Sequence, residues 1–178
     1  KLSKTFSLIW TIDPHEPYQP PDRFRWFSKP PRIANEGNTN DIRSATWEDR
    51  QRLIDLYDDE IRYNDHCIGE IINYLRDSGI YEQTLFIVTG DHGEAFYEHG
   101  VYSHGHMPYD EVIHVPLVIK FSSGVNSGKA VEGLVELIDV FPTLIASMSL
   151  DLKIHADHQM QGNNLLPLIE GSSKQVRE

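Results

Sequence analysis

Cysteine is almost absent from the sequence: Cys67 is the only one in 178 residues. A single thiol excludes an internal disulfide framework and any metal site built from several thiolates. Long apolar runs are missing as well, since none approaches the roughly 20 residues that a membrane-spanning helix needs. We therefore expect no membrane segment in this chain, and one thiol is compatible with any cellular compartment.

Basic residues are also scarce. Lys and Arg number 16 against 27 Asp and Glu, which gives a formal net charge of −11. Proteins that bind nucleic acids or anionic lipids concentrate Lys and Arg on one surface, so this balance argues against both partners. Hydrophobic residues make up 39% of the chain, which is enough for a packed core, and the length is typical of about one domain.

The first half of the chain predicts a strand, a long loop and a long helix. The near-continuous apolar run 6–12 is typical of a strand buried on both faces. Prolines interleaved with aromatic residues, followed by polar residues up to 43, predict a long irregular loop from Pro14. Thr46 is a typical helix N-cap, and apolar residues at helical spacing extend the helix to Gly79, with a break near Asn64 and Asp65.

The second half alternates strand and helix patterns. Residues 84–89 and 115–121 predict strands, and 131–138 predict a fourth, short one. A loop over 90–108 carries four histidines, a helix is expected over 139–148, and a short turn over 164–169. This order predicts an α/β fold with a mostly parallel sheet flanked by helices.

The loop after the second strand carries the clearest chemical signal, Asp91 and His92 between Gly90 and Gly93. Ligands bind beyond the carboxyl ends of strands in α/β sheets, and glycines let the backbone bring a carboxylate and an imidazole together. Mixed oxygen and nitrogen ligands suit a divalent cation, from Ca²⁺ or Mn²⁺ to Zn²⁺. The alternative is an aspartate that caps a turn beside a surface histidine.

Four further histidines follow predicted strands. Three lie in the loop after residues 84–89, and one follows residues 6–12. His104 is the best placed for proton transfer or anion binding near neutral pH, followed by His99 and His106. His15 follows the first predicted strand and is expected to face the same crevice. A solvated loop, or for His15 packing between prolines, explains the same residues without any chemistry.

Taken together, several segments resemble the sulfatases of the alkaline phosphatase superfamily. The resemblance covers residues 5–170 in the family's order, which makes it specific. The segments that carry it are 13–18, 56–65, 84–94, 98–105, 109–120, 138–144 and 162–168. It implies an alkaline-phosphatase-like fold, present here as a partial domain, with residues 1–178 as the C-terminal portion of a sulfatase-like hydrolase domain.

The resemblance also assigns roles to residues. Asp91 and His92 match two metal ligands, and His15 matches a histidine that contacts the transferred group or leaving oxygen. His104 stands where many relatives carry a lysine for the same anion, so both histidines are implied to be catalytic and substrate-binding. Apart from the resemblance, Glu94 is expected to orient His92 or the loop, with stabilisation of the turn as the alternative, and His99 and His106 are expected to support the site from the same loop. One divalent ion is implied, Ca²⁺ first, with Mn²⁺ or Zn²⁺ as alternatives.

The implied reaction is the metal-dependent hydrolysis of small-molecule or saccharide sulfate esters. The family's nucleophile, a metal-bound formylglycine made from Cys or Ser in a Cys/Ser-x-Pro-x-Arg motif, is expected in a segment that precedes Lys1. Cys67 lies in the predicted helix without the Pro and Arg. We therefore expect this chain alone to be inactive. The alternatives are a phosphate or phosphonate ester hydrolase or phospho-group transferase of the same superfamily, and a non-catalytic module that binds anions or a partner.

Overall fold

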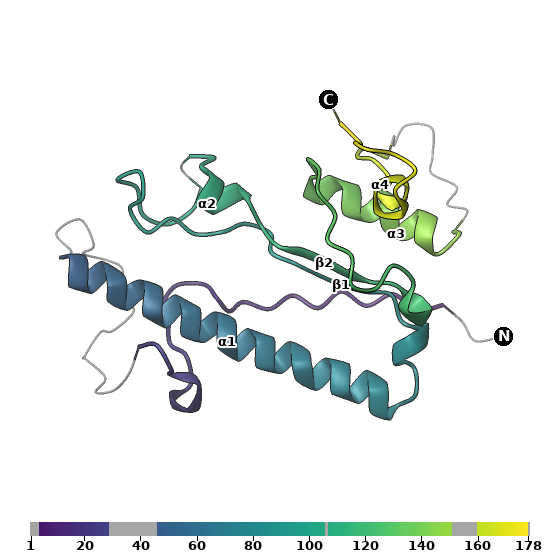
Figure 1. The fold of residues 1–178 in the computed structure, drawn as a ribbon. Coiled ribbons are helices and arrows are strands. Elements are labelled where there is room, and N and C mark those ends of the chain that lie inside the picture. The colour runs from purple at the N-terminus through teal and green to yellow at the C-terminus, as the bar shows by residue number, and fades with distance from the viewer. Residues whose placement is uncertain (1–3, 29–45, 106, 151–159, 178) are drawn as a thin grey trace. The chain divides into compact units, whose positions relative to one another are not determined.

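The computed structural model describes residues 4–28, 46–105, 107–150 and 160–177 (Figure 1). The chain forms two compact units. The first unit consists of Lys1–Gly79 and Glu94–Val112, and the second of Ile80–Gly93 and Ile113–Glu178. The short helix α2 (Asp110–Ile113) runs across the boundary in the chain.

The first unit is built on the helix α1 (Trp47–Asp77), as the sequence predicted. A capping box starts it: the Thr46 hydroxyl accepts the Asp49 amide, and the Asp49 carboxylate accepts the Thr46 amide. Gly79, with a φ of 71°, follows the last turn. The predicted break near Asn64 is wrong, because α1 is continuous there. The Asn64 side chain donates to the Asp13 carbonyl at 2.9 Å instead of competing for the helix backbone.

An aromatic core joins the N-terminal loop to α1. Tyr18, Leu53 and Leu56 are buried, and Tyr57, Phe96 and Tyr102 pack against them. The proline-rich stretch 14–28 is irregular as predicted, apart from the 3-10 helix η1 (Asp22–Phe24). Figure 1 shows this purple segment running beside α1. The remainder of the predicted loop, 29–43, lies outside the described residues.

The predicted buried strand over 6–12 is wrong for this chain. Residues 6–12 form no strand, and their side chains are exposed, with Trp10 at 76% and Ile12 at 79%. A strand needs a neighbour for its amides and carbonyls, and the described residues provide none for this segment. The apolar pattern by itself therefore does not produce a strand, because the segment pairs with no strand in the described part of the chain.

The second unit contains the one sheet found among the described residues. β1 (Phe86–Thr89) pairs antiparallel with β2 (Leu117–Lys120), with Phe86 opposite Lys120 and Thr89 opposite Leu117. The two strands confirm the central predictions, but their direction differs from the expected parallel pairing. A parallel pair needs a crossover, usually a helix, whereas the described residues between β1 and β2 contain no helix besides the four-residue α2. Two 3-10 turns, η3 (Tyr81–Gln83) and η4 (Ser122–Gly124), lie at the same end of the pair and contact each other.

Two helices complete the second unit, α3 (Val140–Ser147) and α4 (Leu166–Glu170), which contact each other. They match the helix predicted over 139–148 and the turn over 164–169. The short strand predicted over 131–138 is wrong: this stretch is irregular and ends in the 3-10 helix η5 (Leu137–Asp139). A second capping box, between Glu136 and Asp139, bends the chain into η5 and prevents extended pairing.

Asp139 is fully buried and holds the second unit together. Its carboxylate accepts the backbone amides of Glu136 at 2.9 Å and Asn163 at 2.7 Å. The guanidinium of Arg177 donates to both of its oxygens, with Nη2 at 2.6 Å from Oδ1. These hydrogen bonds, with Arg177 as the largest contribution, lower the pKa of Asp139 to about 2 against the opposing effect of burial. One side chain thus joins the start of α3 to two later segments of the chain.

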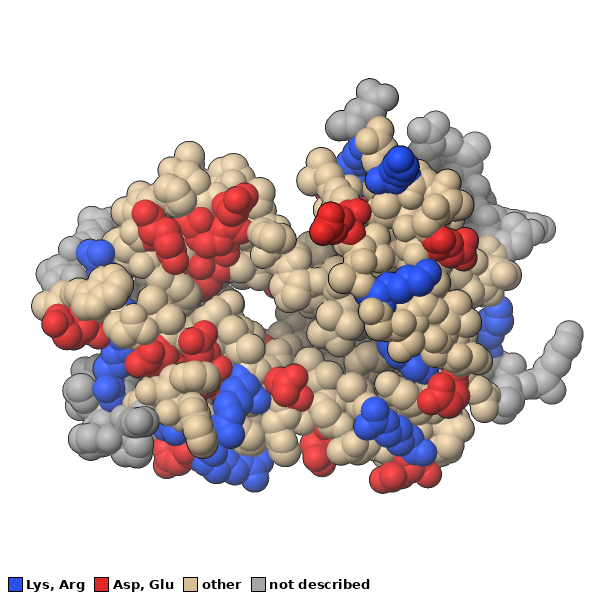
Figure 2. Space-filling model, viewed as in Figure 1, with Lys and Arg blue, Asp and Glu red and all other residues tan. Residues whose placement is uncertain are grey.

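The surface carries charges of both signs. Figure 2 shows small groups of Lys and Arg among Asp, Glu and uncharged side chains on the face displayed. Within the described residues, no helix is both long enough and apolar enough to cross a membrane.

Candidate active site

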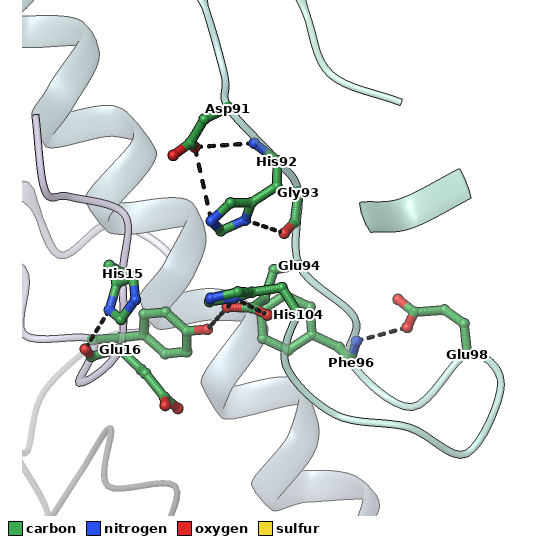
Figure 3. A network of polar contacts seen from close by, with 10 residues as sticks. His15, Glu16, Asp91, His92, Gly93, Glu94, Phe96, Glu98 and His104 are labelled. Carbon is green, nitrogen blue, oxygen red and sulfur yellow. Dashed lines mark hydrogen bonds and ion pairs between the residues drawn. The ribbon is translucent and has the colours of Figure 1, made fainter. Parts of the chain in front are cut away.

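The turn over residues 90–93, directly after β1, brings the two predicted metal ligands together. Asp91 Oδ1 lies 3.8 Å from His92 Nε2 and accepts the His92 backbone amide at 3.0 Å. His92 Nδ1 lies 2.9 Å from the Gly93 carbonyl oxygen (Figure 3). A carbonyl only accepts, so Nδ1 carries a proton, and in the neutral ring Nε2 carries the lone pair on the side of Asp91.

This geometry fits a divalent cation. Ligating histidines usually donate their second ring N–H to a carbonyl or carboxylate, as His92 does to Gly93. We expected the glycines to supply a backbone conformation that other residues avoid. Neither Gly90 nor Gly93 has a positive φ, so the turn does not use that freedom. No group of three or more metal-binding side chains occurs among the described residues. Asp91 and His92 would therefore be two donors of a set completed by others, because such ions take four or more ligands.

Glu94 begins the part of the loop that belongs to the first unit, and it is buried. The Tyr18 hydroxyl donates to Glu94 Oε2 at 2.9 Å, and His104 Nδ1 lies 3.2 Å from Glu94 Oε1 (Figure 3). Burial, together with Tyr102 and Glu94, raises the pKa of Tyr18, so its hydroxyl keeps its proton and donates. The described contacts of the Glu94 side chain are thus with His104 and Tyr18, whereas the sequence led us to expect His92 or the turn as its partner.

His15 lies beside His104 in the same unit. The two rings meet edge to face with centroids 5.4 Å apart and planes at 68°. His15 Nδ1 lies 2.7 Å from the Glu16 carbonyl oxygen, so Nδ1 donates and the lone pair of the neutral ring falls on Nε2. The structure therefore brings together His15 with His104 and, separately in the second unit, Asp91 with His92.

The other two candidate histidines have different outcomes. His99 stacks on Tyr109 with ring centroids 4.0 Å apart, and its Nδ1 lies 2.8 Å from Glu111 Oε1. This hydrogen bond lowers the pKa of the Glu111 carboxyl. His99 thus pairs with a glutamate of α2, and its predicted orienting role stays a prediction. His106 lies outside the described residues.

Sequence reasoning overlooked two carboxylates on α1. Asp59 is fully buried and accepts the backbone amides of Trp26, Phe27 and Ser28. Glu60 is also buried; its Oε1 accepts the Gln19 amide at 2.5 Å, and Oε2 has no hydrogen-bond partner among the described residues. Burial, which is only partly opposed by the Gln19 amide, raises the pKa of Glu60 to about 7. Two adjacent acids in the middle of a helix usually indicate a solvated face, which is why the pattern gave no signal.

A five-residue match to the sequence of the nucleophile motif was also overlooked. Residues 28–32 read Ser-Lys-Pro-Pro-Arg, which fits Ser-x-Pro-x-Arg. Ser28 is only 2% exposed, however, and its hydroxyl donates to Asp59 Oδ2 at 2.6 Å. A nucleophile must reach its substrate, so this buried serine is explained by its contact with Asp59 and the match is coincidental.

Two solved structures with the same fold are phosphonate monoester hydrolases. The chain matches the phosphonate monoester hydrolase of Agrobacterium radiobacter with a TM-score of 0.64 and 32% identity, over 72% of this chain and 25% of that one. It matches the phosphonate monoester hydrolase from Silicibacter pomeroyi with a TM-score of 0.65 and 30% identity, over 75% and 25%. The alkaline-phosphatase-like α/β fold, in a partial form with a small sheet, is thus confirmed.

Sequence comparison defines the family. The family model for Sulfatase matches residues 2–150, and the chain belongs to the sulfatase family of the alkaline phosphatase superfamily. Arylsulfatase K of Gallus gallus is 32% identical over 125 residues, which are 70% of this chain and 22% of that protein. The multifunctional alkaline phosphatase superfamily protein PehA of Trinickia caryophylli is 37% identical over 117 residues, 64% of this chain and 21% of that protein. The chain thus spans about a fifth of the length of the curated relatives it matches.

Proposed function

We propose that the protein containing this chain hydrolyses sulfate esters, with Asp91 and His92 as ligands of a divalent cation. Ca²⁺ is the first choice, and Mn²⁺ and Zn²⁺ are the alternatives. The observation that carries the proposal is the geometry of the turn: His92 donates Nδ1–H to Gly93 and keeps Nε2 beside Asp91 Oδ1. When bound, such a cation draws electron density from the ester oxygens and stabilises the charge that develops during transfer.

We assign the anionic group of the ester to His15 and His104. Each ring has Nδ1 held by an acceptor, so the Nε2 atoms carry the chemistry: a neutral ring accepts a proton there and a cationic ring donates one. Two adjacent imidazoles with this arrangement suit an ester whose leaving oxygen develops negative charge as its bond to sulfur or phosphorus breaks. One ring binds the transferred group while the other protonates the leaving oxygen.

Phosphonate or phosphate ester hydrolysis is the second candidate. The similarity to two solved phosphonate monoester hydrolases at 30% identity or more favours it. Sulfate monoesters carry one negative charge and phosphate monoesters up to two, so a site rich in donors accepts both classes. The two candidates use the same described residues of this chain, and the ester that is turned over fastest distinguishes them.

The test uses the full-length protein. Bound metal is measured by elemental analysis, and hydrolysis is measured with 4-nitrophenyl sulfate, 4-nitrophenyl phosphate and a phenylphosphonate monoester. Asp91→Ala is expected to lose the metal and at least about 100-fold in kcat/KM, because even the loss of a ligand's outer partner costs about 10–100-fold. Asp110→Ala, which removes an exposed carboxylate on α2, is the matched control and is expected to keep both.

The substrate series separates the proposals. Highest kcat/KM on the sulfate ester supports the sulfatase, and highest kcat/KM on the phosphonate or phosphate ester replaces it with the second candidate. A protein that binds no divalent cation and hydrolyses none of the three esters contradicts both. That result leaves a non-catalytic module that binds anions or a partner.

A further inference from the structure

Glu94 is a buried carboxylate with two proton donors. Its side chain is 4% exposed, whereas the His104 side chain is 25% exposed. The Tyr18 hydroxyl donates to Oε2, and His104 Nδ1 lies 3.2 Å from Oε1 and 3.4 Å from Oε2. Tyr18 itself is 1% exposed and belongs to the aromatic core with Leu53 and Leu56. The Glu94 carboxylate is therefore hydrogen-bonded to a residue of the buried aromatic core of the first unit.

These contacts determine which nitrogen of His104 carries the proton. A carboxylate that already receives the Tyr18 hydroxyl accepts from its other neighbours, so His104 Nδ1 is the donor. In the neutral ring the lone pair then lies on Nε2, and in the cationic ring Nε2–H points away from Glu94. A free histidine exchanges between the two tautomers, and a fixed hydrogen bond at one nitrogen selects one of them.

We propose that Glu94 is a positioning residue that holds His104 in the Nδ1–H tautomer and orients its Nε2 toward the anionic ester. This inference rests on the proposed function of His104 and adds the residue that makes His104 competent. Tyr18 contributes by fixing the carboxylate, and the aromatic core fixes Tyr18. His15 reaches the same tautomer through a backbone carbonyl, so both imidazoles present the same nitrogen.

The same unit offers a matched control. His99 Nδ1 and Glu111 Oε1 form a second histidine–glutamate pair, 2.8 Å apart, but the His99 side chain is 50% exposed and the Glu111 side chain 17%. Glu111 therefore has the same chemistry as Glu94 and a shorter contact, without the same burial. A change at Glu111 is expected to leave His104 unaffected.

The first experiment reads the tautomer directly. The full-length protein is labelled with ¹⁵N in the histidine rings, and His104 is assigned by its absence in His104→Asn. The ring shifts distinguish a protonated nitrogen from one with a lone pair. At a pH where the ring is neutral, we expect Nδ1–H in the parent protein, a mixture of both tautomers in Glu94→Gln, and no change in Glu111→Gln. The side-chain amide introduced by Glu94→Gln presents either an acceptor or a donor, which is why the mixture is expected.

Two results overturn the proposal: an Nε2–H tautomer of His104 in the parent protein, or an unchanged Nδ1–H population in Glu94→Gln. The first needs no variant, so the proposal stays falsifiable even if Glu94→Gln does not fold. Both readouts are independent of turnover. An unreactive protein with the expected spectra therefore contradicts the proposed function and not the positioning of His104.

The second experiment separates positioning from general structural support. We expect Glu94→Gln to lower kcat by about 10-fold with a smaller change in KM, because orientation matters most in the transition state. In the His104→Asn background the same change is expected to have no further effect on kcat. A full additional loss in that background would assign Glu94 a role that does not pass through His104.

Discussion

Two buried carboxylates, one in each unit, have pKa values shifted in opposite directions. Asp139 in the second unit is fully buried, and its pKa is lowered to about 2. Glu60 in the first unit is 2% exposed, and its pKa is raised to about 7. Burial acts in the same direction on both, because it disfavours the charged form. The difference comes from the partners.

The partners of the two carboxylates explain the result. Asp139 receives two backbone amides and a guanidinium, which together stabilise its charge more than burial destabilises it. Glu60 receives the Gln19 amide at one oxygen, while the nearby Asp13 raises its pKa further and His15 lowers it. A buried acid therefore strengthens a unit only when its surroundings provide enough donors, and otherwise it weakens the unit as the pH rises.

The largest expected effect is the loss of the Asp139 carboxylate. Asp139→Ala leaves the Arg177 guanidinium and two backbone amides without their acceptor, and we expect the second unit to lose about 4 kcal/mol. Hydrogen–deuterium exchange, resolved by peptide over α3 and α4 in the full-length protein, measures this opening free energy. Glu132→Ala, which removes an exposed carboxylate from the same unit, is expected to leave exchange unchanged. Equal protection in both variants would show that Asp139 does not hold this unit.

Glu60 is expected to give the next largest effect, with the opposite dependence on pH. The pKa of Glu60 in the folded protein lies above the ordinary 4.5. Its contribution to the stability of the first unit is therefore fully present below pH 4.5 and is lost as the pH rises through about 7. The shift corresponds to about 3 kcal/mol, since each pKa unit is about 1.4 kcal/mol. Glu60→Gln keeps an acceptor for the Gln19 amide and cannot ionise, so we expect the alkaline loss of stability of the first unit to disappear.

The measurement is the exchange of α1 peptides between about pH 4 and 9, corrected for the intrinsic exchange rate. His15 lies close enough to lower the pKa of Glu60, so His15→Asn serves as the control. If the alkaline loss persists in Glu60→Gln and vanishes in His15→Asn, the histidine is responsible and Glu60 is not.

Local signals in the sequence were sufficient for α1 and for the 90–93 turn. The capping box of Thr46 and Asp49 lies within four consecutive residues, and so do Asp91, His92 and Gly93. The strand over 6–12 was wrong for the opposite reason, because pairing depends on a neighbour that the segment itself cannot specify. The direction of the β1–β2 pair is likewise decided by the path of the chain between the strands, which periodicity does not encode.

The partners of the buried carboxylates were beyond sequence reasoning. Tyr18 and Glu94 are 76 residues apart in the chain, and Arg177 and Asp139 are 38 apart. No spacing rule connects such residues, because the contact exists only after the loops have packed. The candidate histidines and Glu94 were found by residue type, whereas the contacts of Glu94 with Tyr18 and His104 required the fold.

The smallest expected effect is the loss of stability at low pH, where Asp139 becomes protonated. Its folded pKa of about 2 lies below the ordinary 3.8, so its contribution is present above pH 3.8 and is lost as the pH falls toward 2. The shift corresponds to about 2 kcal/mol. Asp139→Asn retains the shape of the side chain but carries no charge, so it is less stable than the parent protein at pH 5 and has no loss of its own at lower pH. The two stability curves are therefore expected to converge near pH 2, as followed by near-UV circular dichroism during denaturant unfolding. The stability curve of the control Glu132→Gln is expected to run parallel to that of the parent protein throughout. If the curves of Asp139→Asn and the parent protein stay equally far apart from pH 5 to 2, Arg177 does not stabilise the charged form of Asp139.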